Sequence, residues 1–405
     1  MARRFITNLH KRHSKEKRFK AYGLFSIGFA LAFLVILFSM ILSKGGAAFL
    51  RSEIALKIDL TQEKTLEEIN YRQVIKQALK TQFPEVKALS EVNLLYQLVS
   101  KVSAFELQKN LEKNPSLLGK KSVFWFSASS KSDMYFKHKN TSGLNELQIN
   151  WLNELHATNL VREIFNWNFF KFADSREPEI AGIGAGLVGS IFVMIIFLAF
   201  AFPIAVMCAF YLEEFAPKNR LTDIIEISIN NLAAIPSIIY GLLGLTVYLQ
   251  FMNLPRSSSL VGGMTLFMLV LPVIIIATRN TIRSIPSSIR DGAMALGASK
   301  MQVTLHHLLP LSVPGIMTGT ILAISRALGE TAPLLMIGMV AFIADIPLKF
   351  TDPTTVLPVQ IYLWSDSPEA GFSEKTAAAI LVLLGFLILF NLVAIILRKK
   401  FERKW

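Results

Sequence analysis

Six apolar runs, each about as long as a membrane span or longer, constrain the fold of this 405-residue chain more than any other feature. A helix needs about 20 mostly apolar residues to cross a bilayer. The runs lie at, or within, Ala21–Leu42, Ile180–Leu212, Ile224–Leu249, Leu260–Thr278, Val313–Ala344 and Thr376–Leu397. Hydrophobic residues make up 52% of the sequence, which is high for a soluble protein. The pattern predicts an all-α integral membrane protein with six transmembrane helices.

Basic residues concentrate at the two ends of the chain. Residues 1–20 carry eight lysines and arginines against Glu16 alone, and residues 398–405 carry five against Glu402. Basic residues beside membrane spans are retained on the cytoplasmic side. Six spans put both ends on that side, so we expect two basic cytoplasmic tails in a bacterial inner membrane. The net charge of +13 therefore indicates orientation in a membrane, surrounded by lipid, rather than nucleic-acid binding.

The segments between the runs show the same charge asymmetry. The predicted inner segment 279–311 carries four basic residues and one acid, whereas the predicted outer segment 345–375 carries five acids and two lysines. This agreement supports a first transmembrane helix at 21–43 and five more within a core at 179–397.

The long polar segment 44–178 between the first two spans is predicted to be a small α+β periplasmic domain. Leu66–Leu79 spaces its apolar residues at helical intervals, and Leu144–Phe172 is also predicted to be helical. Ser122–Phe136 is predicted to form a hairpin of two aromatic-rich strands.

Some short sequence patterns resemble nucleotide or metal sites, but the surrounding sequence does not support such sites. GAGLVG (Gly184–Gly189) fits a dinucleotide pattern, but no strand precedes it, so its glycines are better explained by close packing of membrane helices. NPSLLGKKS departs from a P-loop, with Asn114 in the first glycine position and Lys121 in the Ser/Thr position. His306 and His307 are adjacent and lack a supporting Cys or carboxylate cluster. We expect no enzyme activity, cofactor or metal here, so that ATP and magnesium belong to a partner.

The inner segment contains a pattern that predicts a helix–glycine–helix elbow. A short helix at Asp291–Leu296 is expected to stop at Gly297, since glycine can adopt the left-handed conformation that ends helices. A second helix should begin after it and reach Leu309–Pro310. A rigid, exposed elbow could act as a lever, although an ordinary connecting loop explains the spacing equally well.

This segment resembles the coupling motif of type I ABC-transporter permeases, written EAA, three residues, Gly, nine residues, I-x-L-P. When the two are aligned on Gly297, Asp291, Gly292 and Ala293 take the EAA positions and Leu309-Pro310 the L-P positions. Asp291 and Gly292 depart from Glu and Ala, and a histidine replaces the usual Ile. The resemblance implies that these residues couple the chain to ATP-binding subunits.

Three further stretches resemble the phosphate branch of that family. They are AAIPSIIYGLLGL at 233–245, RALGETAPLL at 326–335 and TVLPVQIY at 355–362. The resemblance covers about 180–400 and implies a PstA-type permease subunit of an inorganic-phosphate importer. It also implies a second homologous permease, two ATP-binding subunits and a periplasmic phosphate-binding protein as partners. A permease for another oxyanion, such as sulfate or molybdate, or a phosphate-sensing scaffold of the same complex, remains an alternative.

Arg326 and Glu330 stand inside the apolar run that begins near Val313. A separation of four residues puts them on one helix face, where they can pair. Each charge costs roughly 2.5–3.5 kcal/mol at the bilayer centre on insertion scales. One interpretation is a purely structural salt bridge. The other, favoured by the resemblance, is a phosphate path lined by Arg326 and Glu330 with Ser325 and Thr331, since the arginine fork suits an oxyanion.

Overall fold

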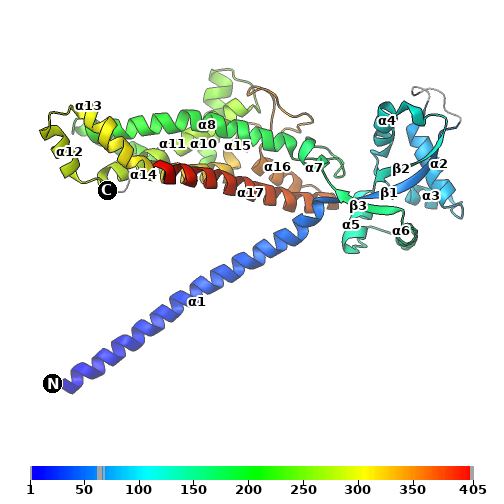
Figure 1. Ribbon diagram of the computed structural model, residues 1–405, viewed down its shortest axis with the longest axis horizontal. Coiled ribbons are helices and arrows are strands. Elements are labelled where there is room, and N and C mark those ends of the chain that lie inside the picture. The colour runs from blue at the N-terminus through cyan, green and yellow to red at the C-terminus, as the bar shows by residue number, and fades with distance from the viewer. Residues whose placement is uncertain (1, 62–65, 67–68, 402–405) are drawn as a thin grey trace.

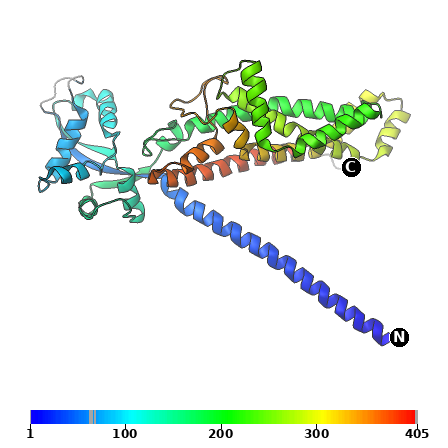
Figure 2. The same ribbon diagram turned by 180° about the vertical axis from the view of Figure 1, so that it is seen from behind.

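The computed structural model describes residues 2–61, 66 and 69–401. Figure 1 and Figure 2 show an elongated molecule with a helical bundle, a small domain at one end of it, and a first helix that diverges from the bundle. That helix, α1 (Ala2–Ala48), contains both the basic segment predicted as a tail and the first predicted span. Near its C-terminal end it contacts the bundle, where Gly45 packs against Ala377.

Long helices and short connecting helices make up the bundle. In chain order they are α8 (Gly184–Phe210), α9 (Arg220–Ala234), α10 (Ser237–Gly244), α11 (Ser259–Ser284), α12 (Ser287–Ala295), α13 (Lys300–Val303), α14 (Leu309–Gly329), α15 (Ala332–Met336), α16 (Leu357–Ser365) and α17 (Ala370–Phe401). Three wider, π-helical turns extend or join them: η2 (Tyr211–Phe215), η3 (Leu245–Phe251) and η4 (Thr304–Leu308).

Within the described residues, five helical segments are long and apolar enough to cross a membrane: Lys11–Ala48, Gly184–Phe215, Ser259–Ser284, Lys300–Gly329 and Ala370–Lys400. The predicted span Ile224–Leu249 is not one straight helix, because α9 and the α10–η3 helix meet at a bend of 102°. Pro236 causes the bend, since it has no N–H to donate to the Leu232 carbonyl four residues earlier. That carbonyl instead accepts the Tyr240 hydroxyl at 2.6 Å. Counted as one span, the bent pair makes six.

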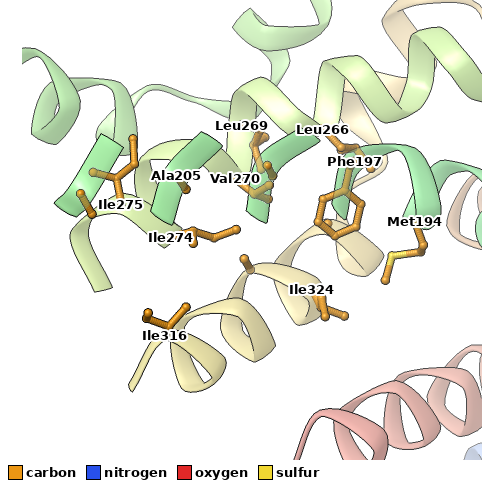
Figure 3. Close-up of a cluster of buried hydrophobic side chains, with 14 of the residues drawn as sticks. Met194, Phe197, Ala205, Leu266, Leu269, Val270, Ile274, Ile275, Ile316 and Ile324 are labelled. Carbon is orange, nitrogen blue, oxygen red and sulfur yellow. The ribbon is translucent and has the colours of Figure 1, made fainter. Parts of the chain in front are cut away.

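The core of the bundle lies between α8, α11 and α14. Figure 3 shows Met194 and Phe197 of α8 packed with Leu266 and Leu269 of α11, with Ile324 of α14 closing the cluster. These side chains are almost fully buried. The helices of the bundle therefore meet through a continuous apolar interior.

The glycines of GAGLVG do allow a close approach, but the closest contacts are not between two membrane-spanning helices as predicted. A Cβ on Gly184 would lie 2.9 Å from the Phe170 carbonyl oxygen, and one on Gly189 would collide with the Thr355 carbonyl. The first contact is with the short helix α7 (Asn168–Lys171) and the second is with the segment that leads into α16, so the backbone of both passes directly over the N-terminal half of α8.

The small domain has an antiparallel sheet of three strands, with the order β2 (Lys121–Ser127), β1 (Leu50–Asp59), β3 (Val161–Phe165). Its helices are α2 (Tyr71–Gln82), α3 (Leu89–Leu95), α4 (Ser103–Lys113), α5 (Ser130–His138) and α6 (Glu146–Ala157), with a 3₁₀ turn, η1, at Pro115–Leu117. Sheet and helices enclose their own apolar core. The predicted α+β class is confirmed. The predicted helix at Leu66–Leu79 corresponds to α2, although residues 67–68 lie outside the described residues.

Two predictions inside this domain are wrong. Ser122–Phe136 is not a hairpin: β2 pairs with β1, and α5 follows it, with the Ser129 hydroxyl accepting from the Ser132 N–H at the helix start. Leu144–Phe172 is not continuously helical, because α6 ends at Ala157 and β3 pairs with β1 before the short helix α7 (Asn168–Lys171). The positive φ of Asn159, 54°, turns the chain between α6 and β3.

Charged side chains join the small domain to the bundle. Lys101 pairs with Glu177 at 3.0 Å, and the Ser130 N–H donates to Glu179 Oε1 at 2.7 Å. Both carboxylates lie on the segment that leads into α8. The two parts of the molecule are therefore held by specific contacts rather than by a loose linker.

Candidate transport site and coupling elbow

The structure confirms the predicted elbow. The helix α12 contains Asp291, Gly292 and Ala293, and the chain turns at Gly297, whose φ is +89°. The Ala298 N–H donates to the Ala293 carbonyl and the Gly297 N–H to the Met294 carbonyl. These two bonds form a Schellman motif, which satisfies carbonyls at the end of α12.

The second helix of the elbow begins at Lys300 with its own cap. The Ser299 hydroxyl accepts from the Gln302 N–H, and the Gln302 side chain accepts from the Ser299 N–H. This reciprocal capping box fixes where the helix starts. The helix then runs through η4 into α14, so Leu309 and Pro310 lie inside it rather than at its end.

The elbow presents apolar side chains to solvent. Leu296 is 91% exposed, and Met294 and Met301 are about half exposed. Asp291, Gly292 and Gly297 share this exposed surface, whereas Ala293 is buried and Leu309 and Pro310 are half-buried. The residues that match the coupling motif are thus partly exposed on the elbow and partly buried beneath it.

A charge network that sequence reasoning missed lies behind the elbow. The α11 helix extends to Ser284, so Arg279 is not in a loop as predicted but is 5% exposed. Its Nε donates to Glu213 Oε1 at 2.6 Å, and its Nη2 lies 2.5 Å from Glu226 Oε1. Arg283 also reaches Glu213, at 2.9 Å. The network therefore joins η2, α9 and α11.

A second link extends from this region into the elbow itself. Arg290 of α12 donates to Glu214 Oε1 and to the carbonyls of Ile282 and Ile285 at the end of α11. The pair of glutamates at 213–214 could have indicated these contacts, because acids at the end of an apolar run need cationic partners. The arginine partners are far away in sequence, and no local pattern identifies them.

The Arg326–Glu330 pair forms, but not in the middle of a helix. Arg326 Nε lies 3.6 Å from Glu330 Oε1, with side chains 36% and 22% exposed. Arg326 is in the last turn of α14, and Glu330 follows the helix with extended backbone. The prediction that Arg326 and Glu330 share one helix face is therefore wrong, because the helix ends between them. Pro333 explains the break, because it cannot donate to the Gly329 carbonyl four residues earlier.

The other two predicted site residues flank this break. Ser325 donates its hydroxyl to Asn391 Oδ1 of α17 at 3.2 Å, which adds Asn391 to the polar residues of the site. Thr331 stands between α14 and α15, and its carbonyl accepts the N–H groups of Leu334 and Leu335. All four predicted residues thus lie around one helix end, together with one polar residue from the last helix.

Sequence comparisons identify the family. Residues 201–405 match the family described as binding-protein-dependent transport system inner membrane component. The chain belongs to this family. It is accordingly a multi-pass membrane permease. Residues 7–146 separately match a domain of unknown function, DUF3333, so the small domain lies mostly within a second family.

Named relatives of this permease family come from several bacteria. The phosphate transport system permease protein PstA of Yersinia pestis is 32% identical over 254 residues, covering 62% of this chain and 85% of that protein. The probable ABC transporter permease YqgI of Bacillus subtilis is 31% identical, covering 56% and 81%. PstA 1 of Mycobacterium tuberculosis H37Rv is 30% identical, covering 55% and 71%. These relatives are transport permeases rather than enzymes.

A solved structure, the inward-facing methionine ABC transporter MetNI, is similar at 15% identity and a TM-score of 0.45, covering 55% of this chain and 96% of that chain.

Proposed function

We propose that this chain is a PstA-type permease subunit of an ATP-driven importer of inorganic phosphate in the bacterial inner membrane. The single observation that carries the proposal is Arg326, presented beside Glu330 where α14 breaks. Similarity to phosphate permeases of Yersinia and Mycobacterium over more than half of the chain supports it.

The geometry at Arg326 suits transient binding of an oxyanion. At 3.6 Å from Nε, Glu330 is too distant for a short charge-assisted hydrogen bond, so the guanidinium keeps donors for a ligand. Its planar fork can donate two hydrogen bonds to one phosphate. Glu330 offsets the positive charge when no anion is bound and thereby weakens binding enough for release.

Partner subunits complete the proposed importer. Two ATP-binding subunits would dock on the exposed elbow around Gly297, and their closure would move α12. A second permease would face this one, and a periplasmic binding protein would deliver phosphate. This arrangement requires six spans, with the bent pair of α9 and α10–η3 counted as one, both termini in the cytoplasm and the domain 44–178 in the periplasm.

Phosphate uptake by an Arg326→Gln variant tests the proposal. We expect the variant to insert and assemble normally but to lose most uptake, with Arg326→Lys retaining an intermediate rate because it keeps the charge without the fork. Unchanged phosphate uptake in Arg326→Gln would refute the role of Arg326 in the phosphate path. Sulfate or molybdate uptake that depends on Arg326 would favour another oxyanion, and lost phosphate signalling with intact uptake would favour a scaffold.

A further inference from the structure

Three apolar side chains remain exposed side by side where the small domain meets the ends of the membrane helices. Leu50 is 39% exposed, Phe165 43% and Trp167 62%. Leu50 and Phe165 are partners in the β1–β3 ladder, and the rings of Phe165 and Trp167 are 4.8 Å apart. We refer to Leu50, Phe165 and Trp167 as the aromatic rim.

The rim is the outer edge of a packed cluster. Phe170 stacks on Phe165 at 6.2 Å and on Phe49 at 5.9 Å, and Phe49 also meets the fully buried Phe169 edge-on. Aromatic contacts of this kind fix the orientation of the rings. The rim is therefore exposed because its position leaves one side open, not because its side chains are loosely attached.

The rim lies next to the end of the first membrane-length helix. The first span ends at Ala48 and β1 begins at Leu50, so only Phe49 separates the sheet from the membrane helix. Ala48 lies roughly 6 Å beyond Lys44, the last charged residue of α1, at 1.5 Å per residue. The polar interface of a bilayer is about 5–7 Å thick on each side. Figure 1 shows β3 next to the junction of α1 and α17.

Cationic side chains border the rim. Lys171 Nζ lies 5.9 Å from the Trp167 ring, and Lys44 and Lys171 are both exposed. Tryptophan favours the membrane interface because its ring is apolar and its N–H is polar, and lysines beside it can reach lipid phosphates. This combination matches a lipid surface better than bulk water.

We propose that the aromatic rim is inserted in the headgroup region of the adjacent leaflet and holds the small domain against the lipid surface. A lipid is favoured over a protein partner because only Phe49 separates β1, which carries Leu50, from α1, whose exposed apolar side chains run as far as Leu42. The proposal does not depend on the substrate that the permease carries.

Site-directed spin labelling of the full chain tests this inference. Cys208 is the only cysteine, so Cys208→Ser provides a background in which single cysteines can be placed. The test variants are W167C and F165C, each of which removes one rim residue while leaving the other two. The matched control is L89C on α3, in the same domain and 83% exposed. Each labelled protein is reconstituted into vesicles of phosphatidylethanolamine and phosphatidylglycerol.

Oxygen concentrates in lipid, whereas a water-soluble nickel chelate is excluded from it. We expect the ratio of oxygen to nickel relaxation to be several-fold higher at residues 167 and 165 than at residue 89. Equal ratios at all three positions would show that the rim faces water and would overturn the proposal. Low access of both reagents to residues 167 and 165 would show that protein covers the rim, which would also overturn it.

Discussion

Arg290 of α12 donates from Nη2 to Glu214 Oε1 at 2.9 Å, while its Nη1 donates to the Ile285 carbonyl at 3.0 Å. One guanidinium thus connects the proposed coupling elbow to the end of α8 and the end of α11. The Arg290 and Glu214 side chains are 22% and 14% exposed, so solvent screens the pair only in part.

Arg290→Met should uncouple the elbow from these helices. Methionine keeps an unbranched apolar side chain but leaves Glu214 without its partner, and hydrogen bonds to charged groups contribute about 1.5–3 kcal/mol each. We expect less phosphate transported per ATP hydrolysed in the reconstituted complex, with docking of the ATP-binding subunits retained. The amount of phosphate transported per ATP by Arg290→Lys should lie between the wild-type and Arg290→Met values, because lysine keeps the charge but lacks the planar guanidinium fork. Unchanged coupling in Arg290→Met would contradict this role.

Two glycines of the elbow form a matched pair for mutation. A Cβ would meet nothing within 4 Å at either Gly292 or Gly297, so crowding does not distinguish them. Gly297 has a φ of +89°, where an L-residue costs about 1–2 kcal/mol, whereas Gly292 is inside α12, where alanine is favoured by about 0.5–1 kcal/mol. Thermal denaturation should show a lower Tm for Gly297→Ala and a higher Tm for Gly292→Ala. Shifts in the same direction would refute the strain argument.

Local patterns predicted the parts of the site that depend on neighbours in sequence. Gly297 favours a helix end whatever tertiary structure surrounds it. Arg326 and Glu330 are close enough along the chain to pair whether the helix continues between them or ends there. The bend at Pro236 and the end of α14 before Pro333 could also have been predicted, since each proline removes a backbone hydrogen bond from the preceding turn.

Contacts between distant segments were not predictable in this way. Glu213 and Arg279 are 66 residues apart, and nothing near either residue identifies the other. The central strand β1 was missed for the same reason, because its partners β2 and β3 lie far along the chain. Without β1, the sequence of β2 was assigned to a hairpin and that of β3 to a helix.

The stability of the small domain should fall as pH rises above the ordinary range of a glutamate. Burial raises the pKa of the Glu106 carboxyl above 4.5, even though Ser127 donates to it from its N–H and its hydroxyl. The folded state therefore binds more protons than the unfolded state between 4.5 and the raised pKa, so stability decreases through that window and then levels off.

Hydrogen exchange of the β2 amides in the full chain measures this effect. Protection factors, corrected for the intrinsic exchange rate, should decline through the titration of Glu106 in the wild type. Glu106→Gln cannot ionise, so its protection should lack that decline. An identical pH profile in the variant would assign the decline to another group.

Gly371, at the start of α17, sets how closely the last membrane helix approaches the small domain. A Cβ there would lie 2.7 Å from Ser130 Oγ and 2.8 Å from Pro178 Cβ. Ser130 cannot move freely, because its hydroxyl donates to Glu179, and the proline ring is rigid. Gly371→Ala should therefore destabilise the junction by about 1–3 kcal/mol, the usual range for overpacking. Gly385→Ala in the same helix meets nothing within 4 Å and is the control. A lower Tm for Gly371→Ala, with no loss for Gly385→Ala, is the expected result. Equal Tm values would mean that the small domain and α17 lie farther apart in the membrane-embedded protein than they do in this structure.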